Sequence, residues 1–171
     1  MKAARRAFWP AAMLGVMGLT MTANQAAPRS GDVALDLKHF KVVAKADGKE
    51  ELVAANEARP GEIIEYQLRC TNEGARDIAD FQPSIPIPAG LEFVPKSATP
   101  DEVTASTDGR TWGAIPLKRT LKLAGGEEKV VPVPYREYRF IRWSAMALGA
   151  GKSLRMSVRA RVAGVPQTDR K

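Results

Sequence analysis

The strongest constraint on the fold is an alternation of apolar and polar side chains in two segments, Glu62–Thr71 and Ser153–Val162. The apolar members are Ile64, Tyr66, Leu68 and Cys70 in the first segment and Leu154, Met156, Val158, Ala160 and Val162 in the second. Successive side chains of a β-strand point to opposite faces of its sheet, so each segment is predicted to be a strand with one buried and one solvated face. An α-helix would distribute the same apolar residues around its axis.

Further short segments of strand character lie between clusters of turn-forming residues. The predicted strands are Val33–Val43, Glu62–Thr71, Phe81–Ile87, Val103–Ser106, Val130–Val133, Glu137–Trp143 and Ser153–Val162. Asp47-Gly48, Pro60-Gly61 and Gly125-Gly126 are among the turn signals that separate them. About seven short strands divided in this way predict an all-β fold, an antiparallel β-sandwich or barrel.

The first predicted strand changes the parity of its apolar residues near the middle. These residues are Val33, Leu35 and Leu37 in the first half and Phe40 and Val42 in the second. We expect the first three to point inward, with either a β-bulge near His39 or a strand that crosses between two sheets to explain the change.

The composition excludes several kinds of site. The chain has 171 residues, which suits a single domain, and it holds one Cys and one His. One Cys rules out an internal disulfide framework and a Cys-rich zinc site. One His leaves too few partners for a Ser-His-Asp triad or a multi-His metal centre. We therefore predict no catalytic residues, no cofactor and no metal site, in a protein that is not an enzyme.

The N-terminal segment has the composition of a secretory signal peptide. Its positive charges are Lys2, Arg5 and Arg6. The uncharged run Ala7–Met21 follows and then gives way to small and polar residues, an order that predicts cleavage after Ala26, with Ala23 and Ala27 as alternatives. An uncleaved membrane anchor is the other interpretation, although the run is shorter than the ~20 residues that span a bilayer. The predicted divisions are a signal peptide over 1–26, one domain over 33–162 and a flexible tail over 163–171.

Several short motifs, in their order and spacing, resemble a conserved-repeat family of bacterial surface proteins, the domain of unknown function eleven. They are Arg59–Tyr66, Thr71–Gly74, Ile87–Val94, Ser97-Ala98, Ser106–Trp112, Arg142-Trp143 and Leu148–Ser153. The similarity extends from about Val33 to Val162. It implies an immunoglobulin-like antiparallel sandwich. Family members often occur as tandem modules, whereas this chain carries one copy.

The same motifs have direct physical interpretations. Asn72 and Gly74 are expected to end a strand because both tolerate the positive φ of a tight turn. Asp108-Gly109 resembles a hairpin turn. Trp112 and Trp143 are expected in the core or at its edge, and none of these positions requires chemistry.

Isolated reactive side chains are each expected to be structural. His39 lacks partners at ligand spacing, and Cys70 follows the apolar parity of its strand, which predicts a buried, inert thiol. The alternative for Cys70 is an intermolecular disulfide in an oxidising compartment. The loop carboxylates are expected to be solvated turn residues rather than calcium ligands. They are Asp77, Asp80, Asp101, Glu102 and Asp108.

The positive charge is the one feature with functional content. Arg155, Arg159 and Arg161 should share the solvated face of the last strand, and Arg139 joins them if the Glu137–Trp143 segment pairs with that strand as a hairpin. Arginines suit phosphate and carboxylate groups. The alternative is a face that only solubilises the sheet.

Taken together, these features predict an exported, non-enzymatic module in the periplasm or outside the cell. Its role would be structural or in protein interaction within the bacterial envelope. An envelope protein or an anionic envelope component is the expected partner, without nucleic acid and without a transmembrane span after signal cleavage. The alternative is a periplasmic binder of an anionic ligand or a metal through the basic sheet face or loop residues.

Overall fold

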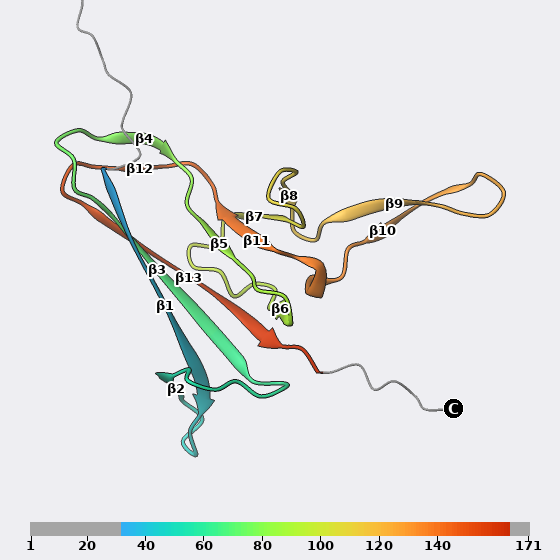
Figure 1. The fold of residues 1–171 in the computed structure, drawn as a ribbon, viewed down its shortest axis with the longest axis horizontal. Helices are drawn as coiled ribbons and strands as arrows, with labels where there is room; N and C mark the ends of the chain where they lie inside the picture. Colours follow the sequence, from blue (N-terminus) through green and yellow to red (C-terminus); the bar gives the residue numbers. More distant parts are fainter. Residues whose placement is uncertain (1–31, 165–171) are drawn as a thin grey trace, which may run out of the picture.

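The computed structural model describes residues 32–164, and within them the chain is all-β with antiparallel pairing throughout (Figure 1). One short 3-10 turn, η1 (Tyr135–Glu137), is the single helical element of this part of the chain. The predicted signal peptide over 1–26 and residues 165–171 of the predicted tail lie outside the described residues.

The first layer is a five-stranded sheet in the order β2-β1-β3-β13-β6. Its strands are β2 (Glu50–Ala54), β1 (Val33–Ala44), β3 (Ile63–Asn72), β13 (Ser153–Val162) and β6 (Leu91–Phe93). The two alternating segments are confirmed as strands, and they pair with each other at the centre of this sheet. Strand β1 pairs with β3 from Val33 to Val42.

The second layer consists of two smaller sheets. A four-stranded sheet has the order β5-β11-β7-β8, and a two-stranded sheet joins β12 to β4. Their strands are β5 (Ser84–Pro86), β11 (Phe140–Trp143), β7 (Val103–Ser106), β8 (Gly113–Ala114), β12 (Met146–Leu148) and β4 (Ile78–Phe81). A separate hairpin of β9 (Lys118–Lys122) and β10 (Glu128–Pro132) extends from the body as an arm (Figure 1).

Side chains from both layers form one apolar core. The five-stranded sheet contributes Leu68, Cys70, Phe93, Met156, Val158 and Ala160, and the second layer contributes Ile78, Ile85, Ala105, Ile141, Trp143 and Leu148. The inward residues of β3 and β13 are those that the alternation predicted. The predicted core position of Trp143 is confirmed as well, and its indole Nε1 donates a hydrogen bond to the carbonyl oxygen of Pro100 at 2.8 Å.

Two predicted strands are wrong as single units. The Phe81–Ile87 segment is divided between β4 and β5 because Pro83, which has no N–H to donate, separates them. The Glu137–Trp143 segment begins as the turn η1, which the Tyr138 amide closes by donating to the carbonyl oxygen of Tyr135. Strand β11 starts only at Phe140. Strands β2, β6, β8 and β12 were not predicted.

The predicted bulge in β1 is also wrong. The pairing of β1 with β3 runs from Val33 to Val42 without a change of register. Leu35 and Leu37 lie opposite Cys70 and Leu68 and therefore share their face, yet they are 65% and 44% exposed. The second layer does not cover this part of β1. The change of parity reflects two faces of one regular strand, because Phe40 and Val42 lie on the opposite face, across from Ala54 and Leu52 of β2.

Asn72 ends β3 through its side chain rather than through a positive φ. The side chain is fully buried, and its amide nitrogen donates to the carbonyl oxygens of Arg76 at 2.7 Å and Leu148 at 3.0 Å. Its Oδ1 accepts a hydrogen bond from the Gly74 amide. A Cβ on Gly74 would lie 3.1 Å from that Oδ1, so this residue is small because of the close approach. Asn72 thus ties the end of β3 to β12 in the other layer.

We expect Asn72→Ala to lower the free energy of unfolding by about 3 kcal/mol, because two buried carbonyl groups lose their donor. Urea unfolding followed by far-UV circular dichroism measures this change. Glu73→Ala, at the neighbouring exposed position, is the control. A loss below about 0.5 kcal/mol for Asn72→Ala, the range of an ordinary surface substitution, would contradict the role given to this side chain.

Candidate anion-binding face

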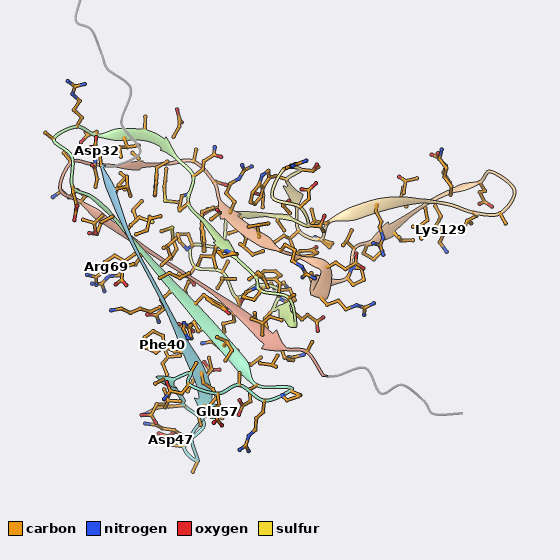
Figure 2. The ribbon with its side chains drawn as sticks, viewed as in Figure 1. Asp32, Phe40, Asp47, Glu57, Arg69 and Lys129 are labelled. Atoms are coloured by element: carbon orange, nitrogen blue, oxygen red, sulfur yellow. The ribbon has the colours of Figure 1, made fainter. Side chains whose placement is uncertain are left out.

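The outer face of the five-stranded sheet, which is the face turned away from the core, carries most of the charged side chains of β1, β3 and β13. Figure 2 shows Arg69 projecting on the side of the sheet that is away from the second layer. Arg155, Arg159 and Arg161 of β13 lie on the same face as Arg69, because Arg155 is its direct cross-strand neighbour. The structure therefore brings together three of the four predicted arginines and adds one from β3.

Arg69 and Arg155 form a cross-strand pair of like charges. Such a pair destabilises a sheet by up to about 1 kcal/mol when nothing compensates it. Within the described residues, neither guanidinium makes a hydrogen bond or an ion pair. Ten N–H donors, five on each guanidinium, are therefore free to bind an anion such as phosphate or carboxylate.

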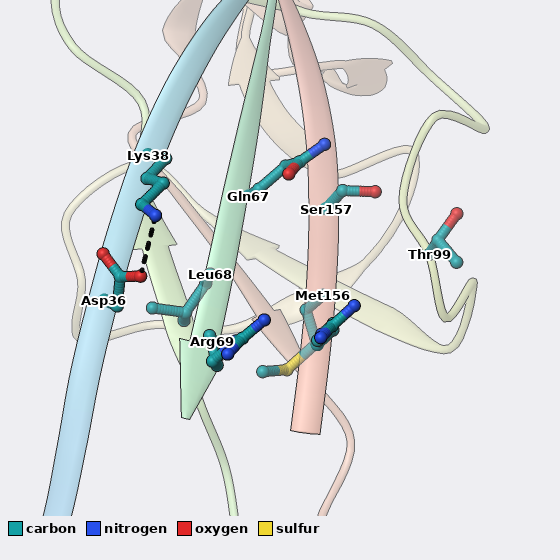
Figure 3. A pocket seen from close by; sticks show the side chains of 9 residues that line it. Asp36, Lys38, Gln67, Leu68, Arg69, Thr99, Met156 and Ser157 are labelled. Carbon is teal, nitrogen blue, oxygen red and sulfur yellow. Dashed lines mark ion pairs between the residues drawn. The ribbon is translucent and has the colours of Figure 1, made fainter. Parts of the chain in front are cut away.

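Neighbouring side chains complete a shallow hollow of about 350 Å³ around this pair (Figure 3). Lys38 and Asp36 of β1 form one wall, and their Nζ and Oδ2 atoms are 3.4 Å apart. Gln67 and Ser157 lie in the next cross-strand row, opposite Lys38. Thr99 closes the far side through its bridge to Ser157. The hollow thus offers three cations, one carboxylate and several neutral hydrogen-bonding groups.

Arg159 is on the same face but its charge is already compensated. Its Nε lies 2.9 Å from Glu65 Oε2, and its Nη2 lies 2.7 Å from Glu50 Oε2. The hydrogen bond from Arg159 lowers the pKa of Glu50, and the bond to Glu50 raises the pKa of Arg159. Arg159 therefore joins β13 to β3 and β2. Arg161 lies farther along the face, opposite Ile63, and is exposed.

Arg139 lies in the other layer. The expected hairpin is not formed, because β11 pairs with β5 and β7 rather than with β13. The Nη1 of Arg139 donates to the carbonyl oxygens of Arg136 and Tyr138. Arg142 of β11 lies over the Trp112 ring, 4.0 Å from its centre, in a cation–π contact. Trp112 is accordingly half-buried at the edge of the second layer.

Arg69 and Lys38 line the hollow but were not among the residues predicted from the sequence. Arg69 occupies a polar position of the alternating Glu62–Thr71 segment, so its face was predictable. The cross-strand neighbour of Arg69 was not predictable, because only the register of β3 against β13 determines that Arg155 stands opposite it. The one available signal was that both alternating segments carry an Arg on the predicted solvated face.

The other reactive groups have structural environments. Cys70 is fully buried, and the loss of solvent raises the pKa of its thiol to about 11, which keeps it protonated and unreactive at neutral pH. His39 is exposed on β1, with its ring centre 6.3 Å from that of Tyr66. In residues 32–164, no three His, Cys, Asp or Glu side chains are grouped closely enough to hold a metal ion.

The predicted turn at Asp108-Gly109 is confirmed and is built by side chains. Oδ1 of Asp108 accepts hydrogen bonds from the amides of Arg110 and Thr111, each at 2.8 Å, and lies 2.9 Å from Ser106 Oγ. Gly109 has a φ of 75°, which this turn requires. The amides of Thr111 and Arg110 and the Ser106 hydroxyl lower the pKa of Asp108 to about 2.

Comparison of the chain with protein-family models, with curated proteins and with solved structures finds no match in any of the three. A search of residues 32–164 for a helix of the length and apolarity needed to cross a bilayer finds none.

The Asp108 turn makes stability depend on pH in acid. The folded-state pKa of about 2 is below the ordinary value of 3.8, so the unfolded chain binds the proton first as the pH falls. The contribution of Asp108 is complete above that ordinary value and is lost as the pH falls towards 2. We expect the difference in unfolding free energy between the wild type and Asp108→Asn to shrink between pH 4 and pH 2, as measured by urea unfolding. A difference that is constant over this interval would contradict the assignment.

Proposed function

We propose that this protein is an exported, non-enzymatic, immunoglobulin-like module of the bacterial envelope whose outer sheet face binds an anionic partner. The Arg69–Arg155 pair carries the proposal, because two guanidinium groups that make no ion pair stand directly opposite each other on an open face, where Asp36 is the one carboxylate of the hollow. Lys38, which also lines the hollow, adds a third cation.

The resemblance to the conserved-repeat family supports the immunoglobulin-like part of the proposal. Two antiparallel layers share one core, and the motif residues Asn72, Asp108 and Trp143 each have a defined structural role. Tyr138 is also fully buried just before β11, and its hydroxyl accepts a hydrogen bond from the Leu117 amide at 2.7 Å. A buried Trp in the shared core is a feature of immunoglobulin-like sandwiches.

The chemistry of the hollow supports anion binding. Arg is permanently protonated, and Lys keeps its proton at neutral pH unless it is desolvated. The Lys38 ammonium is 63% exposed and is paired with Asp36. The three cations can hold an anion through charge-assisted hydrogen bonds.

The second candidate is a periplasmic binder of a small anionic ligand. The observation that favours it is the volume of the hollow, about 350 Å³, which is within the range of small-molecule sites. The alternative predicted from the sequence also includes binding of a metal and binding through loop residues.

The decisive experiment replaces the arginine pair by Arg69→Gln and Arg155→Gln. We expect the double variant to bind vesicles that contain an anionic phospholipid about 30-fold more weakly than the wild type, from about 1 kcal/mol for each cation at the surface. Vesicle co-sedimentation at two salt concentrations measures the effect. Lys118→Gln with Lys122→Gln, on the β9–β10 arm, removes the same charge elsewhere and should leave binding nearly unchanged.

Equal binding by the arginine double variant and the wild type would overturn the proposal. Saturable binding of inorganic phosphate without any vesicle binding would favour the small-ligand alternative instead.

The export half of the proposal has its own measurement. Mass spectrometry of the protein purified from cells that express the full chain should show a chain that lacks residues 1–26. An intact N-terminus would contradict export with cleavage.

A further inference from the structure

We propose that Leu35–His39, in the first half of β1, is a self-pairing edge that joins two copies of this chain into a symmetric dimer. The inference is independent of the proposed anion-binding function.

This part of β1 has a neighbour on one side only. Strand β3 pairs with β1 from Val33 to Val42, whereas β2 pairs with β1 only from Phe40 to Ala44. Within residues 32–164, no strand pairs with the other edge of Val33–His39. The five-stranded sheet therefore ends there in a row of open backbone groups.

The register shows which backbone groups are open. The Glu73 amide donates to the carbonyl oxygen of Asp32, and the Lys45 amide donates to that of Lys49. The N–H and C=O of one residue point to the same side of a strand, and the side alternates along it. The backbone groups of Val33, Leu35, Leu37 and His39 consequently point to the open edge. Such a row is a template for another strand.

Three other sheet edges of the described residues, at β6, β5 and β8, are protected. Beyond β6, the segment that follows it covers β13 through the Thr99–Ser157 bridge and the bond from the Val94 amide to the Arg159 carbonyl. In the second layer the edge strands β5 and β8 are very short, and β5 ends in Pro86. Short strands and prolines are ordinary protections against edge pairing, and β1 has neither.

The side chains at the open edge are apolar and uncovered. Leu35 and Leu37 are 65% and 44% exposed, although their face is the one that is buried elsewhere in this sheet. A strand added at this edge would bring new side chains beside both leucines on that face. An extended strand with apolar side chains would therefore satisfy both the open backbone groups and the exposed leucines.

Charge complementarity favours a second copy of β1 as the occupant. When two copies pair antiparallel with Leu37 opposite Leu37, Asp36 of each copy stands opposite Lys38 of the other. Centring the pair on Asp36 would instead place two like charges opposite each other, which is unfavourable. In the Leu37-centred register the open backbone groups of Leu35, Leu37 and His39 face those of the other copy, and the pairing stops before Phe40, where β2 occupies the edge. The contact is closed by a two-fold axis, as in most homodimers.

A charge exchange at Leu37 tests this pairing on full chains, expressed and purified in the same way. We expect the wild type to form a dimer in sedimentation-velocity runs over a concentration series. Leu37→Glu and Leu37→Lys should each raise the dimer dissociation constant at least about tenfold, because like charges meet at the axis. An equimolar mixture of the two variants should recover the dimer, since opposite charges then meet.

Val130→Glu on the arm is the matched control, because Val130 is 63% exposed and lies on β10. This variant should dimerise like the wild type, and thermal unfolding should show that all variants are folded. A wild type that stays monomeric, a dimer that survives both Leu37 variants, a mixture that fails to recover it, or equal loss with Val130→Glu would each overturn the proposal. A monomer whose Leu35 and Leu37 amides resist hydrogen exchange would show that another strand of the same chain occupies the edge.

Discussion

The pairing of β3 with β13 is the interaction on which the rest of the structure depends. Its register places Leu68 opposite Met156 on the inner face, where both enter the core. The same register places Arg69 opposite Arg155 on the outer face. A slip of one residue would exchange the two faces of the slipped strand and would bury arginines in the core. The burial that stabilises the fold therefore also holds the two like charges together, with the Asp36 carboxylate as the cross-strand neighbour of Arg69 on β1.

Periodicity predicted β3 and β13 well because it is a local property of the chain. It could not predict which strand stands beside which, and it could not predict which part of a face the other layer covers. Leu35 and Leu37 show the consequence. They have the parity of core residues and lie opposite Cys70 and Leu68, but they are exposed because the second layer does not extend over β1. Exposure of this kind depends on the size of the opposing sheets, which no single strand encodes.

The turn residues show a related limit. The positions of Asn72 and Asp108 at chain reversals were predictable from residue type, because Asn and Asp bond readily to nearby backbone. For Asp108 the partners are local, and the turn was predicted correctly. For Asn72 one partner is the carbonyl oxygen of Leu148, 76 residues away, so the contribution of this side chain to holding the layers together was hidden from local reasoning. The prediction for Arg139 was wrong for the same reason, because the strand order places β11 beside β5 and β7 in the second layer.

The two proposed surfaces reinforce each other through geometry. In an antiparallel edge pair that is centred on Leu37, the axis is perpendicular to the sheet, so both outer faces point the same way. The dimer would then present two Arg69–Arg155 pairs on one continuous surface. A partner that is itself repetitive, such as a charged membrane or polymer, would engage both pairs, and the second contact would benefit from a high effective concentration. A free phosphate would gain nothing from the second site. Loss of the dimer should therefore weaken binding to an extended anionic surface while leaving the intrinsic affinity for a small anion unchanged.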